Sequence, residues 1–276
     1  MAFEGYYWRL AQPGFSVCAI AGVCRDWTMV TLATSDGDVW TEITEQPVHG
    51  RTVDAGVLRA DDTSLDVDLG PGLSVRLADR REWPRRPFGP LGAAQSIPWL
   101  GQYWAPWLLG ARVSGTFGTR SLEGADVYAE KNWGAAFADH WWWGQAEGVA
   151  FAGGRIHGVA PTAVALWTPE GVVTLAPPLA RTVARVGGGE WHIRAGNGRW
   201  RFELEGEITT PPLRLPVPIP GPERRLEPRS DHHLLGQVEY TVWRGGRLWH
   251  RHAGEAALED GSVPKDEQGD VVVAPA

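Results

Sequence analysis

Short segments in which apolar and polar residues alternate recur along most of this chain. A period of two is that of a β-strand, whose successive side chains point to opposite faces of a sheet. Clusters of Gly, Asn, Asp and Pro, which favour turns, separate these segments. The sequence therefore predicts an all-β fold, built as closed barrels or packed sheets because both arrangements protect strand edges. The clearest alternating segments are 38–43, 65–69, 73–77, 191–194, 200–205 and 237–243.

The composition limits the partners and the compartment that we expect. The chain has 276 residues and a net charge of −7 at pH 7, and it is long enough for one large domain or two small ones. Because nucleic-acid binding needs clustered cations, we expect no nucleic-acid partner. The first residues lack the basic and apolar regions of a signal peptide, and no apolar run approaches the roughly 18 residues of a membrane span. We therefore expect a cytoplasmic protein.

The cysteines and histidines suggest neither a disulfide nor a metal site. Cys18 and Cys24 belong to one apolar segment, and in a continuous strand they would lie roughly 20 Å apart, too far for a disulfide. We expect two buried, reduced thiols. The pairs His232-His233 and His250-Arg-His252 lack a carboxylate or cysteine partner at metal-ligand spacing. Nucleotide-binding fingerprints are also absent, so we expect neither a metal nor a cofactor.

The segment 126–147 carries the densest chemistry of the chain, including four of its 16 tryptophans. If 126–134 and 141–147 are strands, Tyr128, Glu130 and Asn132 share one face of the first. Two indoles and an amide then share one face of the second, and 134–140 is short enough to connect the two as a hairpin. An apolar wall with a few placed polar groups is typical of a small-molecule site. In an alternative interpretation, the tryptophans of this segment are ordinary core residues, and Glu130 with Lys131 forms a structural ion pair.

The same segment resembles the tocopherol cyclase family. The resemblance rests on Tyr128-Ala-Glu-Lys-Asn-Trp-Gly134, on Phe137 and on Trp141-x-Trp143-x-Gln145, with a weaker match at Glu4-Gly-Tyr-Tyr-Trp. Ala138 stands where that family has Pro, and Glu147 where the plant enzymes tend to have Asn. The resemblance implies two lipocalin-like antiparallel β-barrel or sandwich domains packed together, with a ligand site between or within them. We place these domains at 1–120 and 121–265, followed by a tail at 266–276.

The resemblance also implies a chemistry, in which a prenyl double bond is protonated and a phenol oxygen captures the cation. Such a reaction needs an acid, electron-rich walls and exclusion of water. Indole faces stabilise cations, and an apolar pocket keeps a carboxylic acid protonated. Our candidates for the acid are Glu130, Glu4 and Glu147, with Tyr103 as a phenolic alternative. The candidate substrate-binding residues are Trp141, Trp143, Gln145 (which would orient a substrate oxygen), Asn132, Trp133, Tyr128, Trp104 and Tyr6.

These features favour a cofactor-independent cyclase, an isomerase or intramolecular lyase, acting on a prenylated hydroquinone or related terpenoid lipid. Its partner would be an apolar small molecule, with peripheral membrane contact as a route for substrate access; the oligomeric state stays open. Three alternatives remain. A carotenoid-hydratase-like enzyme would add water to a terpenoid alkene, a pericyclic cyclase would need no acid, and a lipocalin-like carrier would bind an apolar ligand unchanged.

Overall fold

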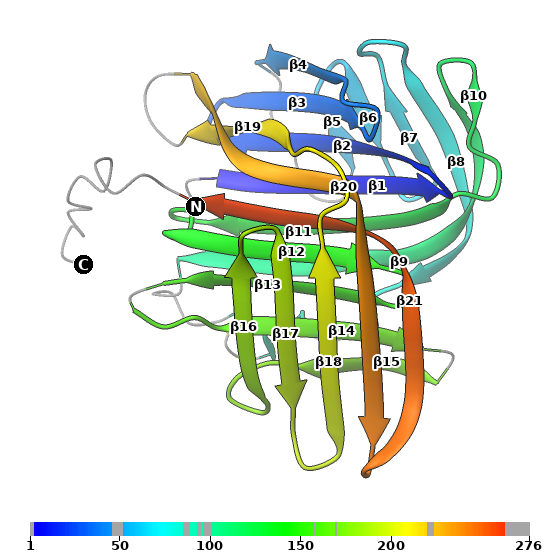
Figure 1. Cartoon of the computed structure of the whole chain (residues 1–276). Helices are drawn as coiled ribbons and strands as arrows, with labels where there is room; N and C mark the ends of the chain where they lie inside the picture. Colours follow the sequence, from blue (N-terminus) through cyan, green and yellow to red (C-terminus); the bar gives the residue numbers. More distant parts are fainter. Residues whose placement is uncertain are drawn as a thin grey trace.

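The computed structural model describes residues 3–45, 52–84, 89–92, 95, 101–156, 158–168, 170–219 and 224–262. Within these residues strands dominate, no α-helix occurs, and two antiparallel sheets form (Figure 1). The described residues also contain no helix of the length and apolarity that a membrane span requires. The predicted all-β fold is confirmed. The expected tail, 266–276, lies outside the described residues.

The first sheet holds the N-terminal half of the chain. Its strands follow the order β4-β3-β2-β1-β11-β9-β8-β7-β6-β5, and β10 pairs with β9. The bounds are β1 (Phe3–Gln12), β2 (Phe15–Cys24), β3 (Trp27–Thr34), β4 (Val39–Thr44), β5 (Val53–Asp54), β6 (Leu58–Ala60), β7 (Ser64–Val67), β8 (Leu73–Glu82), β9 (Gln102–Phe117), β10 (Arg120–Ser121) and β11 (Asp126–Gly134).

The second sheet holds the C-terminal half. Its order is β15-β14-β13-β12-β21-β20-β18-β17-β16, and β19 pairs with β20. The bounds are β12 (His140–Ala146), β13 (Val149–Arg155), β14 (Thr162–Thr168), β15 (Gly171–Leu175), β16 (Arg181–Gly187), β17 (Glu190–Gly196), β18 (Trp200–Glu207), β19 (Leu213–Ile219), β20 (Arg225–Arg244) and β21 (Arg247–Ser262).

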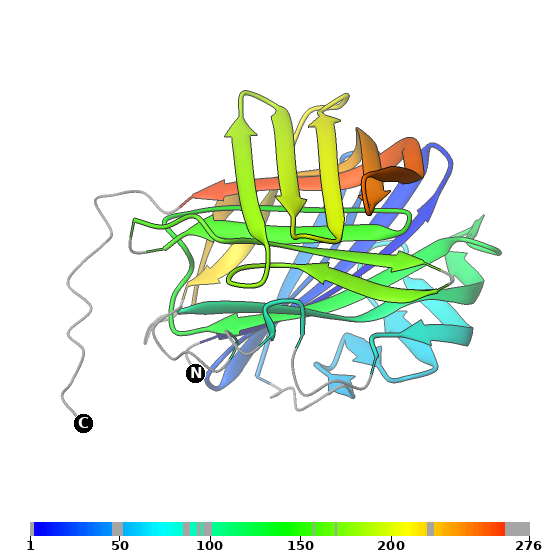
Figure 2. The same cartoon turned by 90° about the horizontal axis from the view of Figure 1, so that it is seen from below.

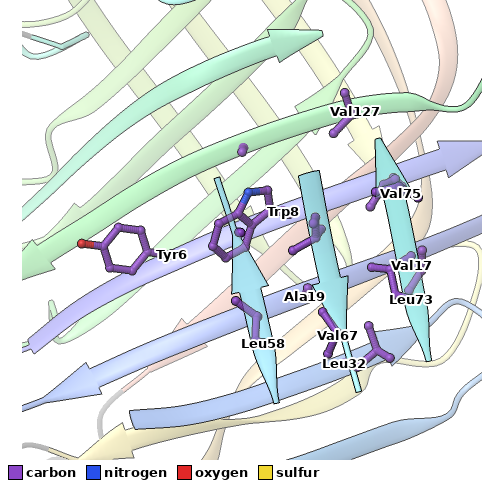
Figure 3. Close-up of a cluster of buried hydrophobic side chains, with 14 of the residues drawn as sticks. Tyr6, Trp8, Val17, Ala19, Leu32, Leu58, Val67, Leu73, Val75 and Val127 are labelled. Carbon is purple, nitrogen blue, oxygen red and sulfur yellow. The ribbon is translucent and has the colours of Figure 1, made fainter. Parts of the chain in front are cut away.

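Each sheet curls around a core of its own. In the first, Trp8 and Ala19 from β1 and β2 pack against Leu58, Val67 and other apolar residues of β6 to β8, which lie across them in Figure 3. In the second, β16 to β18 run at a steep angle to β12 to β15 (Figures 1 and 2), and Trp142, Phe151 and other buried residues fill the bend. These curled sheets are lipocalin-like half-barrels, as expected.

A third apolar cluster joins the two half-barrels. It contains Tyr7 and Tyr128 from the first sheet and Trp143 and Leu234 from the second. Strand alternation explains how one strand serves two cores. On β1, Trp8 points into the first half-barrel and Tyr7 to the junction; on β12, Trp142 points into the second half-barrel and Trp143 to the junction. Both faces of these strands are therefore buried.

One expectation about the middle of the chain needs correction. The predicted hairpin between 126–134 and 141–147 is wrong, because β11 pairs with β1 and β9 whereas β12 pairs with β13 and β21. Both edges of β11 are already occupied, so β12 begins another sheet. The change from one sheet to the other consequently lies between Gly134 and His140. The domain division at 120/121 stays a prediction.

The cysteines agree with the sequence-based expectation. Cys18 and Cys24 are both buried and unbonded in β2. Burial raises the pKa of Cys18 to about 12 and that of Cys24 to about 11, so neither thiol has the properties of an activated nucleophile.

Candidate functional site

A cavity of about 630 Å³ lies between the two sheets. Strands β1, β2, β9 and β11 line it from the first sheet, and β12, β13, β19, β20 and β21 from the second. Its volume is in the range of small-molecule sites, and its wall is largely apolar and aromatic. The polar side chains on that wall include Glu4, Glu130, His232 and Glu259.

Glu130 is the most deeply buried carboxyl group on this wall, with 4% of its surface exposed. Its Oε2 accepts three hydrogen bonds from described residues: from Trp104 Nε1 at 2.5 Å, Tyr128 Oη at 2.6 Å and Trp143 Nε1 at 2.7 Å. Tyr128 and Glu130 share a face of β11, as the alternation predicts. Trp104 comes from β9, the neighbour of β11 in the same sheet, whereas Trp143 on β12 reaches Glu130 because the two sheets meet here.

The protonation of Glu130 follows from this environment. Burial raises the pKa of Glu130 to about 7, although the three donors act in the opposite direction. Since three donors saturate Oε2, the acid form must carry its proton on Oε1. Among the described residues no hydrogen-bond partner of Oε1 is found, and Glu130 lines the cavity. Glu130 therefore presents to the cavity a carboxyl group that keeps its proton up to about pH 7.

A second polar group faces the same cavity from the other sheet. Strands β20 and β21 pair His232 with Glu259, and Glu259 Oε2 lies 3.4 Å from His232 Nδ1. Tyr7 Oη lies 3.1 Å from His232 Nε2. Glu259 Oε1 accepts hydrogen bonds from Trp141 Nε1 at 2.7 Å and Ser230 Oγ at 2.8 Å. Burial alone would raise the pKa of Glu259, but His232 and these donors hold it below its ordinary value.

Trp143 connects the two polar groups. Its Nε1 donates to Glu130, its ring stacks on His232 with a centroid distance of 5.7 Å, and Tyr7 meets the ring edge-on at 5.1 Å. A single indole thus lies between Glu130, whose pKa is raised, and the pair of His232 with Glu259, in which the pKa of the carboxyl group is lowered. Two carboxyl groups at one cavity have their pKa values shifted in opposite directions, which is typical of acid–base sites.

Lys131 pairs with Glu4 rather than with Glu130. Lys131 Nζ lies 2.8 Å from Glu4 Oε2, which also accepts a hydrogen bond from Tyr6 Oη at 2.8 Å. Since Tyr6 pairs with Lys131 across β1 and β11, this group ties the two strands together at the cavity. The alternative interpretation, an ion pair between Glu130 and Lys131, is therefore wrong, because the carboxylate that pairs with Lys131 is that of Glu4.

Most of the residues proposed from the sequence lie on the cavity wall. They are Glu4, Tyr6, Tyr103, Trp104, Glu130, Asn132, Trp141 and Trp143. Tyr128 lies behind Glu130 as a donor, and Trp133 stacks on Tyr103 with a centroid distance of 5.6 Å; neither is among the lining residues.

Gln145 and Glu147 do not reach the cavity wall. Gln145 is buried at the junction, where its Oε1 accepts a hydrogen bond from Arg9 Nη1 at 2.7 Å and its Nε2 donates to the Ala146 carbonyl. This amide is engaged by protein, so its expected role in orienting a substrate oxygen needs correction. The Glu147 side chain is 77% exposed, a surface position unsuited to a buried acid.

Sequence reasoning missed Tyr7, His232 and Glu259. Tyr7 follows Tyr6 within the motif at the N-terminus, and the alternation of β1 could have placed it on the opposite face. The pair His232-His233 is evident in the sequence, but no carboxylate or cysteine lies near it at metal-ligand spacing. Its carboxylate is 27 residues away in sequence and becomes a neighbour only through the register of β20 and β21. No group of His, Cys, Asp and Glu suited to a metal occurs among the described residues.

Comparison with known proteins supports the fold of this chain but assigns the chain to no family. No protein-family model matches the sequence, and no curated protein matches it. The crystal structure of kievitone hydratase from Nectria haematococca is similar over 96% of this chain and 90% of that chain, with a TM-score of 0.54 and 9% identity. The crystal structure of an AttH-like protein from Nitrosomonas europaea is similar over 95% of this chain and 93% of that chain, with a TM-score of 0.45 and 15% identity. The likeness to the hydratase supports a lipocalin-like fold and does not single out the tocopherol cyclase family.

Proposed function

We propose that this protein is a cofactor-independent enzyme that adds an O–H group across a carbon–carbon double bond of an apolar substrate. One observation carries the proposal: Glu130 is a buried acid whose Oε2 is saturated by donors, which leaves the proton of Oε1 for the cavity. Protonation of an alkene by this acid gives a tertiary cation and the Glu130 carboxylate. The attacking oxygen then forms the new C–O bond and releases its proton, which restores the acid through solvent.

The aromatic wall suits a cationic intermediate. Trp104, Trp141 and Trp143 line the cavity, and each indole N–H donates to Glu130 or Glu259. These hydrogen bonds fix the orientation of the rings. An indole face stabilises a nearby cation by about 0.5–2 kcal/mol, and a placed general acid contributes roughly 10²–10⁴ in rate.

The first candidate nucleophile is a hydroxyl within the substrate, so that the reaction is a cyclisation of a prenylated hydroquinone or related terpenoid lipid. The tocopherol cyclase-like motif at 128–145 supports this choice, since its Glu130, Trp141 and Trp143 all line the cavity. The second candidate is water. The fold similarity to an enzyme named kievitone hydratase favours hydration as the alternative.

Product mass in deuterated buffer tests the reaction class. The purified protein is incubated with prenylated hydroquinones and linear terpenoids. Cyclisation is expected to give an isomer of the substrate with one non-exchangeable deuterium, and hydration adds the mass of water as well. A ligand that co-purifies and is recovered unchanged, with no product from any substrate, would favour a carrier and contradict the proposal.

Substitution of the acid tests its assignment. Glu130→Gln is expected to lower turnover by roughly 10²-fold or more, because the amide has no acidic proton. Wild-type activity should fall as pH rises above about 7, where Glu130 loses its proton. Glu147→Gln, at an exposed position outside the cavity, is the matched control and should retain activity. Normal turnover of Glu130→Gln would favour a pericyclic mechanism, which needs no acid.

A further inference from the structure

The polar group formed by Tyr7, His232 and Glu259 has no part in the delivery of a proton from Glu130. Its three residues come from β1, β20 and β21, and all of them line the cavity. The exposed fraction of Tyr7 is 7% and that of His232 is 1%. Buried polar side chains that converge on an otherwise apolar wall commonly fix the orientation of a ligand.

The surroundings of His232 determine which nitrogen carries its proton. Glu259 Oε1 accepts hydrogen bonds from Trp141 and Ser230, and Glu259 Oε2 lies 3.4 Å from His232 Nδ1, a buried nitrogen with no hydrogen-bond partner among the described residues. The negative charge of this carboxylate lies beside Nδ1 and favours the tautomer with its proton on that nitrogen. In that tautomer Nε2 is an acceptor and takes the hydrogen bond from Tyr7 Oη at 3.1 Å.

This direction of donation leaves the oxygen of Tyr7 as an acceptor. Tyr7 Oη donates its only hydrogen to His232 Nε2, and its lone pairs can accept a hydrogen bond from a donor in the cavity. Burial raises the pKa of Tyr7 well above its ordinary value, so the phenol stays neutral. A ligand hydroxyl can donate to Tyr7 Oη, whereas a hydrocarbon or an ether has no hydrogen to donate.

We propose that Tyr7, oriented by His232 and Glu259, is a hydroxyl-recognition site, and that the ligand of the cavity is an apolar molecule bearing a phenol or alcohol group. The inference deepens the proposed function and rests on it only in taking this cavity as the ligand site. Trp143 places the hydroxyl site next to the acid, because the same indole contacts Tyr7, His232 and Glu130. A phenolic ligand held here would have its apolar chain along the Trp-lined wall.

A pair of probes without an alkene separates recognition from chemistry. The probes are 4-dodecylphenol and its methyl ether, and their affinities are measured by quenching of tryptophan fluorescence. We expect the wild-type protein to bind the phenol roughly 10-fold more tightly, since the ether leaves the Tyr7 acceptor without a partner. Tyr7→Phe and His232→Gln should each bring the ratio of the two affinities close to one.

Matched controls show whether the effect belongs to this site. Tyr240→Phe removes the hydroxyl of a buried tyrosine in the second core, and His233→Gln changes the neighbouring histidine, which contacts the Thr210 carbonyl. Both should retain the wild-type ratio. Circular dichroism of each variant confirms folding, and the conservative Tyr7→Phe change keeps the test available if His232→Gln does not fold.

The outcomes distinguish this inference from the proposed reaction. Equal wild-type affinity for phenol and ether, or a preference that survives both Tyr7→Phe and His232→Gln, would overturn hydroxyl recognition even if the enzyme cyclises or hydrates an alkene. A preference for the phenol that disappears in both variants supports recognition even if no alkene is turned over. In that case only the proposed reaction fails.

Discussion

At the scale of the residue, Glu130 shows how an apolar site changes the chemistry of a common side chain. The carboxyl group is buried, yet its hydrogen-bond donors are neutral indole and phenol groups rather than a cation. Neutral donors orient the group and lower its pKa less than a paired Arg or Lys would. Lys131 follows directly in the chain but pairs with Glu4. Although Lys131 is next to Glu130 in the sequence, its ammonium group therefore pairs with another carboxylate and leaves Glu130 with neutral donors.

The raised pKa of Glu130 predicts a pH dependence of stability. The carboxyl group has a pKa of about 7 in the folded protein and 4.5 in its ordinary state. Between these values the folded state holds a proton that the unfolded state has lost, so the free energy of unfolding should fall as pH rises from 4.5 to about 7. The total effect is at most about 3 kcal/mol. Urea unfolding across this window should show the decline.

Two variants test the origin of that decline. Glu130→Gln cannot titrate, so its free energy of unfolding should depend less on pH than that of the wild type between 4.5 and 7. Glu147→Gln, at the exposed position, should reproduce the wild-type slope. If Glu130→Gln retains the full wild-type slope, other groups cause the decline and the carboxyl is not protonated in the folded state.

At the scale of the element, the pairing of β12 with β21 positions the aromatic wall. Trp141 lies opposite Gly261 in the register, and its indole covers that glycine. A Cβ at position 261 would lie 2.1 Å from Trp141 Cε2 and Cζ2, far inside van der Waals contact. Glycine weakens a strand in general, but here it permits a close approach. The lack of a side chain at Gly261 on β21 thus leaves room for the Trp141 ring of β12 on the cavity wall.

Gly261→Ala should consequently disturb the cavity more than an ordinary surface change would. The methyl group must displace the Trp141 ring and its hydrogen bond to Glu259, at a cost of about 1–3 kcal/mol in stability. We expect weaker binding of 4-dodecylphenol, measured by fluorescence quenching. Gly198→Ala is the control, because a Cβ there meets nothing within 4 Å. Equal binding by the two variants would argue against a role for the Trp141 position.

At the scale of the whole molecule, the cavity exists only because two half-barrels are held together. Arg9 is buried at their junction, on the face of β1 that also carries Tyr7. Its Nη1 donates to Gln145 Oε1 on β12 at 2.7 Å, and its Nη2 donates to the Leu234 carbonyl on β20 at 3.2 Å. Nε donates to Ser16 Oγ at 3.0 Å within the first sheet. One guanidinium therefore links the two sheets through neutral acceptors.

Removal of this link should be costly. Arg9→Ala deprives buried acceptors on both sheets of their donor and leaves unfilled volume, so we expect a loss of about 2–3 kcal/mol in the free energy of unfolding. Urea unfolding measures the loss. Arg76→Ala is the control: Arg76 forms an exposed ion pair with Asp66 at 3.0 Å, and its removal should change stability by less than about 1 kcal/mol. Equal losses for the two variants would contradict the role of Arg9.

The sequence by itself determined the all-β class, the aromatic wall and a short set of candidate acids that includes Glu130. Alternation is a local property, since neighbouring side chains of a strand must point to opposite faces, and it can be read without knowing which strands pair. This is why Tyr128, Glu130 and Asn132 could be assigned to one face, and why the fold class was predicted. The concentration of tryptophans around 141–143 likewise marked a wall of the cavity.

Only the tertiary structure decided which strands meet. Alternation cannot tell a barrel interior from a junction when both faces of a strand are buried, as on β1 and β12. For this reason the hairpin after β11 was wrong, and the interactions of Gln145 with Arg9 and of His232 with Glu259 were not foreseen. These contacts join residues far apart in sequence, and their formation depends on register and packing across two sheets. Pairing is set by the free energy of the whole assembly, which no local pattern contains.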